Sequence, residues 1–186
     1  MVFLTCPYSL RAQHMGRGIG PARPPTGTSS PAPANSDVND FTRAIALQAT
    51  AEQLARFPQL TKSTDAARKQ AETLIQQAEK SNKVDSSAYA QLSDAVDEAR
   101  GANLKFVNTF TAPQQSGLKP LIKKLSKADV DIGKDSEALQ KLGGSESNGK
   151  KVSALVQRLD KALTDFQSEQ IDIGKQMGIQ PNGQPQ

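Results

Sequence analysis

The side chains that most often bind metals or carry thiol chemistry are scarce in this sequence. Among 186 residues there is one cysteine, Cys6, and one histidine, His14. Structural zinc sites are built from Cys and His ligands, and di-iron helical bundles need Glu-x-x-His motifs that face inward. The sequence therefore excludes a site of Cys or His ligands inside a folded core, and it predicts a protein without a metal or any other cofactor.

Two other patterns could carry nucleophilic or acid–base chemistry. Ser147-Asn-Gly-Lys150 has the form S-x-x-K, in which a desolvated lysine activates a serine one helical turn away. Here the motif lies in a glycine-rich loop that leaves both groups hydrated. Carboxylates also gather beside lysine or arginine at helix-surface spacing, which is typical of a solvated face; these are Asp94, Asp97 and Glu98, and Asp129, Asp131 and Asp135. We therefore predict no enzyme activity.

A basic stripe is the one local concentration of charge. Lys119, Lys123, Lys124 and Lys127 follow helical spacing near the start of a predicted helix. Lysines at a helix start oppose the macrodipole, which suggests another benefit, such as binding an anionic lipid or nucleic acid. Acidic residues follow from Asp129 onward, however, and no aromatic or arginine side chain lies between the lysines to stack on bases. We interpret the stripe as a solvated face, with an anionic-partner patch as the alternative.

The elements that position these residues are helices. From residue 38 onward, apolar residues recur every three or four positions and strand signals are absent, which predicts an all-α body over residues 38–178. The pattern gives helices at about 51–80, 86–111, 117–142 and 150–177, with residues 38–49 as an extension or a short separate helix. Helices of similar length joined by short loops favour an up-down-up-down antiparallel four-helix bundle.

Pro58 falls inside the first of these helices. A proline normally ends or kinks a helix, but the apolar spacing continues without a break from Phe57 through Leu60 to Leu74. Thr50 and Gln53 also have the spacing of a capping box, which marks a helix start before the proline. The sequence therefore predicts one helix kinked at Pro58 rather than two helices.

Polar residues interrupt the apolar stripes at four positions, Asn103, Asp129, Ser136 and Gln170. A stripe with this spacing drifts toward the edge of a straight helix, which would leave such residues partly solvated. Alternatively, Asn103 and Gln170 form a buried polar pair between two helices, which fixes their register at some cost in stability. Neither interpretation implies a substrate.

The two ends of the chain have the composition of targeting and linker segments. Residues 1–12 resemble the last part of a secretory signal, here incomplete. A lipid-anchored Cys6 and an inert cytoplasmic tail are the alternatives. Residues 13–37 are rich in Gly, Pro and Ser, which predicts a disordered linker, and residues 179–186 are predicted to be a disordered tail. The longest apolar run, residues 1–5, is far too short to cross a bilayer.

One short motif bears on the compartment. Leu163-Thr164-Asp-Phe-Gln167 has the form L-T-x-x-Q, and Thr50-Ala-Glu-Gln53 shares the T-x-x-Q part. The motif is similar to the repeated motif of small periplasmic helical stress chaperones. That resemblance implies a periplasmic location.

The sequence thus predicts a non-enzymatic helical interaction or structural module, periplasmic or secreted, with an unknown protein partner. The first alternative is a periplasmic chaperone-like or lipid-binding protein that exposes an apolar face when its bundle opens. The second is a cytoplasmic nucleic-acid accessory protein that uses the lysine stripe. The non-enzymatic functions come first because the sequence offers no suitable set of catalytic residues. The nucleic-acid function comes last because the net charge is only +4.

Overall fold

The described part of the chain is helical. The computed structural model describes residues 45–80, 84–143 and 149–180, so the predictions for residues 1–44 and 181–186 lie outside it. All described residues belong to one compact unit, Asn35–Gln186. Its helices are α2 (Ala51–Lys80), α3 (Ser86–Val107), α4 (Ala112–Gly117), α5 (Lys119–Gly143) and α6 (Gly149–Gln176). These ranges contain no β-strand, which confirms the predicted all-α class for the described residues.

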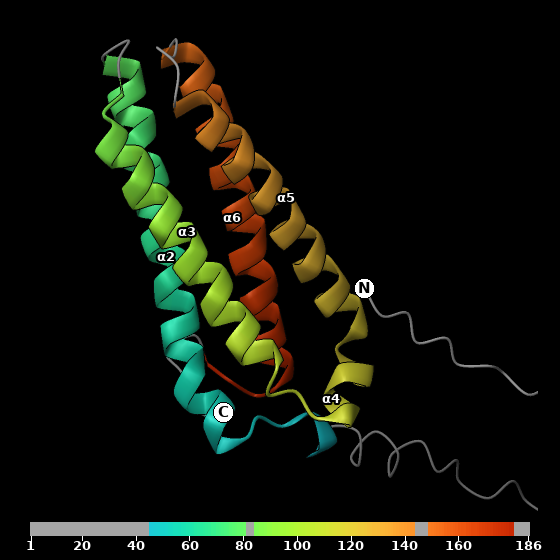
Figure 1. Cartoon of the computed structure of the whole chain (residues 1–186). Coiled ribbons are helices and arrows are strands. Elements are labelled where there is room, and N and C mark those ends of the chain that lie inside the picture. The colour runs from blue at the N-terminus through green and yellow to red at the C-terminus, as the bar shows by residue number, and fades with distance from the viewer. Residues whose placement is uncertain (1–44, 81–83, 144–148, 181–186) are drawn as a thin grey trace, which may run out of the picture. The chain divides into compact units, whose positions relative to one another are not determined.

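The long helices α2, α3, α5 and α6 lie side by side (Figure 1). Contacts are most extensive between α2 and α6, between α5 and α6, and between α2 and α3, whereas α3 and α5 touch over far fewer residues. Phe57, Phe106 and Phe166 bring one fully buried ring each from α2, α3 and α6. Alanine, leucine and valine fill most of the remaining core, so the helices are held mainly by burial of small apolar side chains.

α2 runs through Pro58 as one helix. Pro58 is exposed while Phe57 and Leu60 are buried, so the ring lies on the solvent side and the apolar stripe continues past it. The Thr61 hydroxyl donates hydrogen bonds to the carbonyls of Phe57 and Pro58, at 3.3 and 3.1 Å. At the helix start, Gln53 N donates to Thr50 Oγ1 at 3.3 Å and Thr50 N donates to Gln53 Oε1 at 2.8 Å, which completes a capping box.

The connection from α3 to α5 differs from the prediction. A helix was expected to extend to residue 111, but α3 ends at Val107, and the short helix α4 comes before α5. Thr111 starts α4 with a second capping box, in which Gln114 N donates to Thr111 Oγ1 and Thr111 N donates to Gln114 Oε1. Side-chain caps that satisfy free backbone N–H groups make a new helix start favourable here.

The C-terminal boundary also needs correction. Ile179 was assigned to a disordered tail, but it is only 1% exposed. Gly178 adopts a positive φ of 71°, which reverses the chain after α6, and Ile179 N donates to Gly174 O at 2.8 Å. Ala49 N donates to Met177 O at 2.9 Å, so this turn is also tied to the segment before α2. Across the described ranges, no helix combines the length and apolar character needed to cross a membrane.

Candidate binding site between α3 and α5

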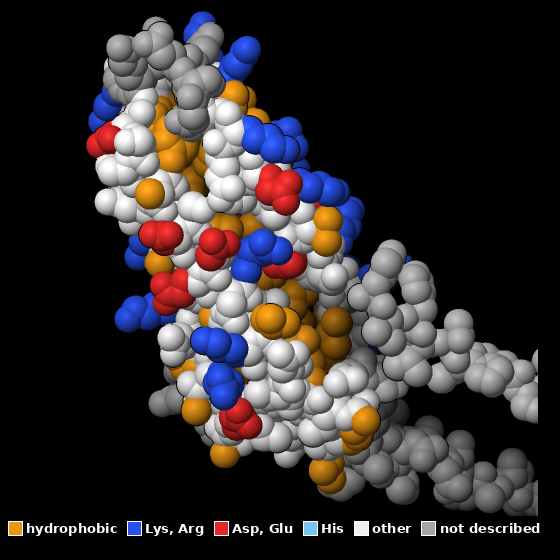
Figure 2. All heavy atoms as spheres, in the orientation of Figure 1, with side chains coloured by type: hydrophobic (Ala, Val, Ile, Leu, Met, Phe, Trp, Pro, Cys, Tyr) orange, Lys and Arg blue, Asp and Glu red, His pale blue; other side chains and the backbone are white. Residues whose placement is uncertain are grey.

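A groove follows the sparsely packed line between α3 and α5, and we call it the seam groove. Its volume is about 430 Å³, and its apolar walls are Leu104 and Val107 from α3 and Ile122 and Leu125 from α5. Figure 2 shows hydrophobic side chains along this seam. Ligand sites in proteins are concave, mostly apolar and of this size, with a few placed polar groups. The seam groove has that composition.

The floor of the seam groove connects to a buried polar network. Asn103 lines the groove and is 9% exposed, while Gln170 and Thr64 behind it are 1% and 0% exposed. Gln170 Nε2 donates to Asn103 Oδ1 at 3.3 Å, and the Thr64 hydroxyl donates to Gln170 Oε1 at 3.1 Å. The structure therefore brings Asn103 and Gln170 together between α3 and α6, and it adds Thr64 of α2, which the sequence patterns did not single out.

The Asn103 amide keeps hydrogen-bonding capacity on its groove side. Within the described residues, the hydrogen bond of its side chain involves Oδ1, and Nδ2 has no partner. An amide has one acceptor oxygen and two N–H donors, and covering such a donor without giving it a partner is costly. A molecule in the seam groove could therefore accept a hydrogen bond from Asn103.

An ion pair bridges α3 and α5 at one end of the groove. Arg100 Nε and Nη2 donate to the two carboxylate oxygens of Asp129, at 2.8 and 3.1 Å. This hydrogen bonding raises the pKa of Arg100 above its ordinary value, with a smaller opposing effect from burial. Asp129 thus lies at the edge of the α5 stripe, half-buried, and its charge is compensated by a fixed partner. Ser136 is half-buried as well.

The four lysines of the stripe are all exposed but do not face the same way. Lys124 pairs with Glu169 of α6 at 3.7 Å, and Lys127 lies with Lys124 along the α5–α6 boundary. Lys119 and Lys123 precede the groove residues Ile122 and Ser126 by three positions each. Residues three or four apart are neighbours on a helix surface, so these two lysines lie on the outer face of α5, next to the α5 rim of the seam groove. Lys124 and Lys127 lie toward α6.

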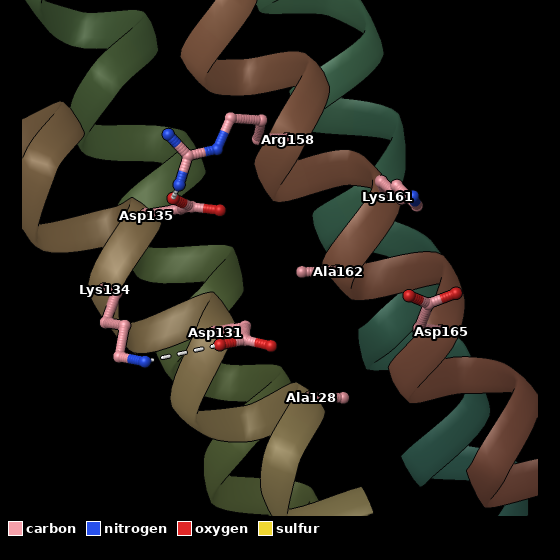
Figure 3. Close-up of a pocket in the computed structure, with 8 residues that line it drawn as sticks. All are labelled: Ala128, Asp131, Lys134, Asp135, Arg158, Lys161, Ala162 and Asp165. Carbon is pink, nitrogen blue, oxygen red and sulfur yellow. Dashed lines mark hydrogen bonds and ion pairs between the residues drawn. The ribbon is translucent and has the colours of Figure 1, made fainter. Parts of the chain in front are cut away.

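A second groove, between α5 and α6, is strongly charged (Figure 3). Asp135 and Arg158 point toward each other across it, and Arg158 Nη2 lies 2.6 Å from Asp135 Oδ1. The small side chains of Ala128 and Ala162 also line this groove. The lining includes three acidic and three basic residues, so their charges balance; they are Asp131, Asp135 and Asp165, and Lys134, Arg158 and Lys161.

Asp135 is a buried residue that the predicted stripes did not include. Ser136 was expected on the apolar stripe of α5, but the Asp135 side chain is the buried one, only 8% exposed. The signal was present, since Asp135 follows Leu125, Ala128 and Ile132 at spacings of three, four and three. A stripe through Ala128 rather than Asp129 would have found it.

No cluster of metal-binding side chains occurs in the described part of the chain. Ser147 of the S-x-x-K pattern lies outside the described residues. No protein-family model, curated protein or solved structure matches the chain.

Proposed function

We propose that this protein is a non-enzymatic helical interaction module that binds a partner through the seam groove. In this proposal α2, α3, α5 and α6 form an up-down-up-down four-helix bundle, and α4 belongs to the connection between the second and third helices. The module is exported to the periplasm or beyond, and the signal-like residues 1–12 and the linker composition of residues 13–37 support this location.

The observation that carries the proposal is the unequal packing of the four long helices. Three helix pairs have extensive contacts, whereas α3 and α5 leave a groove with apolar walls. Leu104 is 62% exposed and lines this groove. Exposed apolar surface rimmed by polar residues is typical of a site that another molecule covers.

A second candidate function is supported by the contacts that cross the seam. Ser93 Oγ accepts a hydrogen bond from Gln140 Nε2 at 3.1 Å, and Arg100 pairs with Asp129. Both contacts are partly solvated, and such polar contacts contribute little stability. A bundle that separates along this seam would expose its core, as the chaperone-like or lipid-binding alternative requires.

Two measurements test the proposed function. Mass spectrometry of the mature N-terminus in the native host determines whether residues before the linker are removed, and an intact N-terminus on a protein retained in the cytoplasm would contradict export. A solvatochromic apolar dye tests the groove. We expect stoichiometric binding that Leu104→Gln weakens and that Ile45→Gln, at a 52% exposed residue outside the groove, leaves unchanged.

Dye binding also distinguishes the two candidate functions. Saturable binding that depends on Leu104, with a cooperative unfolding transition, agrees with a preformed site. Weakly saturable binding that is insensitive to Leu104→Gln would contradict the seam groove as the binding surface and favour a bundle that opens.

A further inference from the structure

We propose that the partner of the seam groove is an acidic amphipathic helix of another protein. This inference rests on the proposed function, and it specifies the chemistry of the partner. It combines the length of the groove, the exposed apolar side chains at its rims, the positions of two lysines and the free side of the Asn103 amide.

The groove has the dimensions of a helix-binding surface. Its lining residues extend from Arg100 to Val107 on α3 and from Ile122 to Asp129 on α5. Seven residues of helix rise by about 10 Å, which equals the spacing of apolar anchors at positions i, i+3 or i+4, and i+7 of a docked helix. Two turns of a partner helix can therefore place their apolar face between α3 and α5.

Exposed apolar side chains extend this surface beyond the walls of the groove. The large hydrophobic side chains classed as exposed among the described residues are Ile45, Leu104 and Val130. Leu104 lines the groove on α3, and Val130, which is 50% exposed, follows the groove residue Ser126 on α5 by four positions, a spacing that makes them neighbours on the helix surface. A fifth helix that lies along the seam would cover both, and a slender acyl chain inside the groove would not.

Charge complementarity makes the partner acidic. In the part of the chain that the structure describes, no ion pair engages Lys119 or Lys123, the two lysines next to the α5 rim. The carboxylate of Asp129 already has Arg100 as a bidentate partner, so it does not offset these lysines. Glutamate or aspartate on the flank of a docked helix would be attracted electrostatically to Lys119 and Lys123.

The Asn103 amide favours a peptide over a fatty acid. Asn103 offers a hydrogen-bonding group at the floor between apolar walls. A polar side chain in the apolar face of a partner helix can satisfy that group, whereas the methylene groups of an acyl chain would bury it without a partner. We therefore argue for the helix, and an acyl ligand is an outcome that the experiment distinguishes.

The experiment uses the full chain and three probes. The first is a synthetic amphipathic peptide of about 18 residues, with leucine at i, i+4 and i+7, one glutamine among them, and glutamate on its flanks; this length is sufficient for partial helicity. The second carries lysine in place of each glutamate, and the third is oleate. Fluorescence anisotropy measures peptide binding, and displacement of the solvatochromic dye measures oleate binding.

We expect the acidic peptide to bind at least about tenfold more tightly than the basic one, because like charges meet at the rim. Lys119→Glu combined with Lys123→Glu should reduce acidic-peptide affinity by about tenfold and improve binding of the basic peptide. The matched control, Lys62→Glu combined with Lys69→Glu, changes exposed lysines of α2 and should leave both affinities within about twofold. Circular dichroism verifies that each variant is folded.

Each contrary result has a defined meaning. Equal affinity for both peptides, or equal effects of the two double substitutions, would overturn the acidic partner. Oleate binding that depends on Leu104, without binding of either peptide, would replace the helix by an amphiphile. If none of the three probes binds while the dye still binds at Leu104, this inference fails and the proposed function stands. Loss of Leu104-dependent dye binding defeats both.

Discussion

Gln53 and Gln114 are joined by two reciprocal amide hydrogen bonds between the starts of α2 and α4. Gln53 Nε2 donates to Gln114 Oε1 at 2.9 Å, and Gln114 Nε2 donates to Gln53 Oε1 at 3.1 Å. Each amide also donates to a backbone carbonyl of the opposite segment, Gln53 to Thr109 and Gln114 to Gln48. Both side chains are buried and cap their own helix, so one amide pair connects two capping boxes.

The two segments that this pair joins have a similar spacing of buried residues after their capping boxes. The sequences Thr50-Ala-Glu-Gln53 and Thr111-Ala-Pro-Gln114 are separated by the 61 residues that also separate the two glutamines. At that separation, several buried positions of α2 correspond to buried positions at Leu118 and in α5; the pairs include Phe57 with Leu118, Ala67 with Ala128, Ala71 with Ile132, Leu74 with Asp135, and Ala78 with Leu139. The reciprocal bonds therefore join the starts of two segments that share much of their pattern of buried positions.

Removing either glutamine should destabilise the protein more than its own contacts suggest. Gln53→Leu leaves the Gln114 amide buried without its partner and removes a cap, so we expect a loss of about 1–3 kcal/mol in the free energy of unfolding. Gln114→Leu should behave alike. The double substitution should cost less than the sum of the single losses, since the bonds between the two amides can be lost only once. Urea denaturation measures all three values.

The matched control is Gln76→Leu, at an exposed position of α2. It should change stability by no more than about 0.5 kcal/mol. Strictly additive losses at Gln53 and Gln114 would contradict the reciprocal pair and would leave only two independent caps.

The buried network below the seam groove predicts an asymmetry between its two amides. Asn103→Leu leaves Gln170 Nε2 unpaired at a side chain only 1% exposed, and we expect a loss of about 1–3 kcal/mol. Gln170→Leu should destabilise the protein less, because the Asn103 amide can turn to solvent in the groove. The Thr64 hydroxyl also keeps its hydrogen bond to the Leu60 carbonyl, at 3.2 Å. Replacing both by leucine should raise the melting temperature, since apolar packing replaces two desolvated amides.

Thermal unfolding of the two single variants and the double variant tests this order. Equal small losses in both single variants, adding in the double variant, would show that these amides are solvated edge residues. Retention of acidic-peptide binding by Gln170→Leu, together with weakened binding by Asn103→Leu, is the outcome expected if the free side of Asn103 serves the groove.

Asp135 is a carboxylate at the position where the equivalent residue of α2 is leucine, Leu74. It is buried, while its partner Arg158 is 69% exposed. Arg158→Gln should therefore destabilise by about 1–3 kcal/mol, because an unpaired carboxylate stays behind. Asp135→Leu should be neutral or stabilising, because the freed guanidinium remains hydrated and apolar area is buried. Equal destabilisation by both changes, measured by urea denaturation, would contradict this argument.

Periodicity in the sequence was sufficient to predict the four long helices but not the break between α3 and α4. The stripe from Phe57 to Ala78 carried the prediction of one helix across Pro58, since a continuous face has only one helical phase. The break between α3 and α4 was missed because the stripe continues through Phe106 and Phe110, both of which are buried. The capping box of Thr111 and Gln114 sets the start of α4. This signal involves only two residues three positions apart, so it does not interrupt the apolar stripe.

The candidate site was less predictable, because a groove depends on how far two helices separate. The stripes indicated Asn103 and Gln170 as possible partners, and the structure places them in contact. Neither stripe indicated that α3 and α5 pack sparsely. Leu104 and Ile122 are compatible with a helix surface whether or not another helix packs closely against them. The division of the lysine stripe also followed only from the location of α6, which supplies Glu169 to Lys124.

Two helical glycines should respond to the same substitution with opposite sign. A methyl group on Gly174 of α6 would overlap the ring of Phe57, which is buried and lies 5.7 Å from the Phe106 ring, so the ring has little room to move. We expect Gly174→Ala to cost about 1–3 kcal/mol through overpacking. Gly101 of α3 has no atom within 4 Å of the added methyl group, and Gly101→Ala should stabilise by about 0.5–1 kcal/mol because alanine loses less backbone entropy in a helix. Urea midpoints of the two variants provide the comparison, and a Gly174→Ala protein as stable as the unmodified chain would show that α2 and α6 do not approach closely at Phe57.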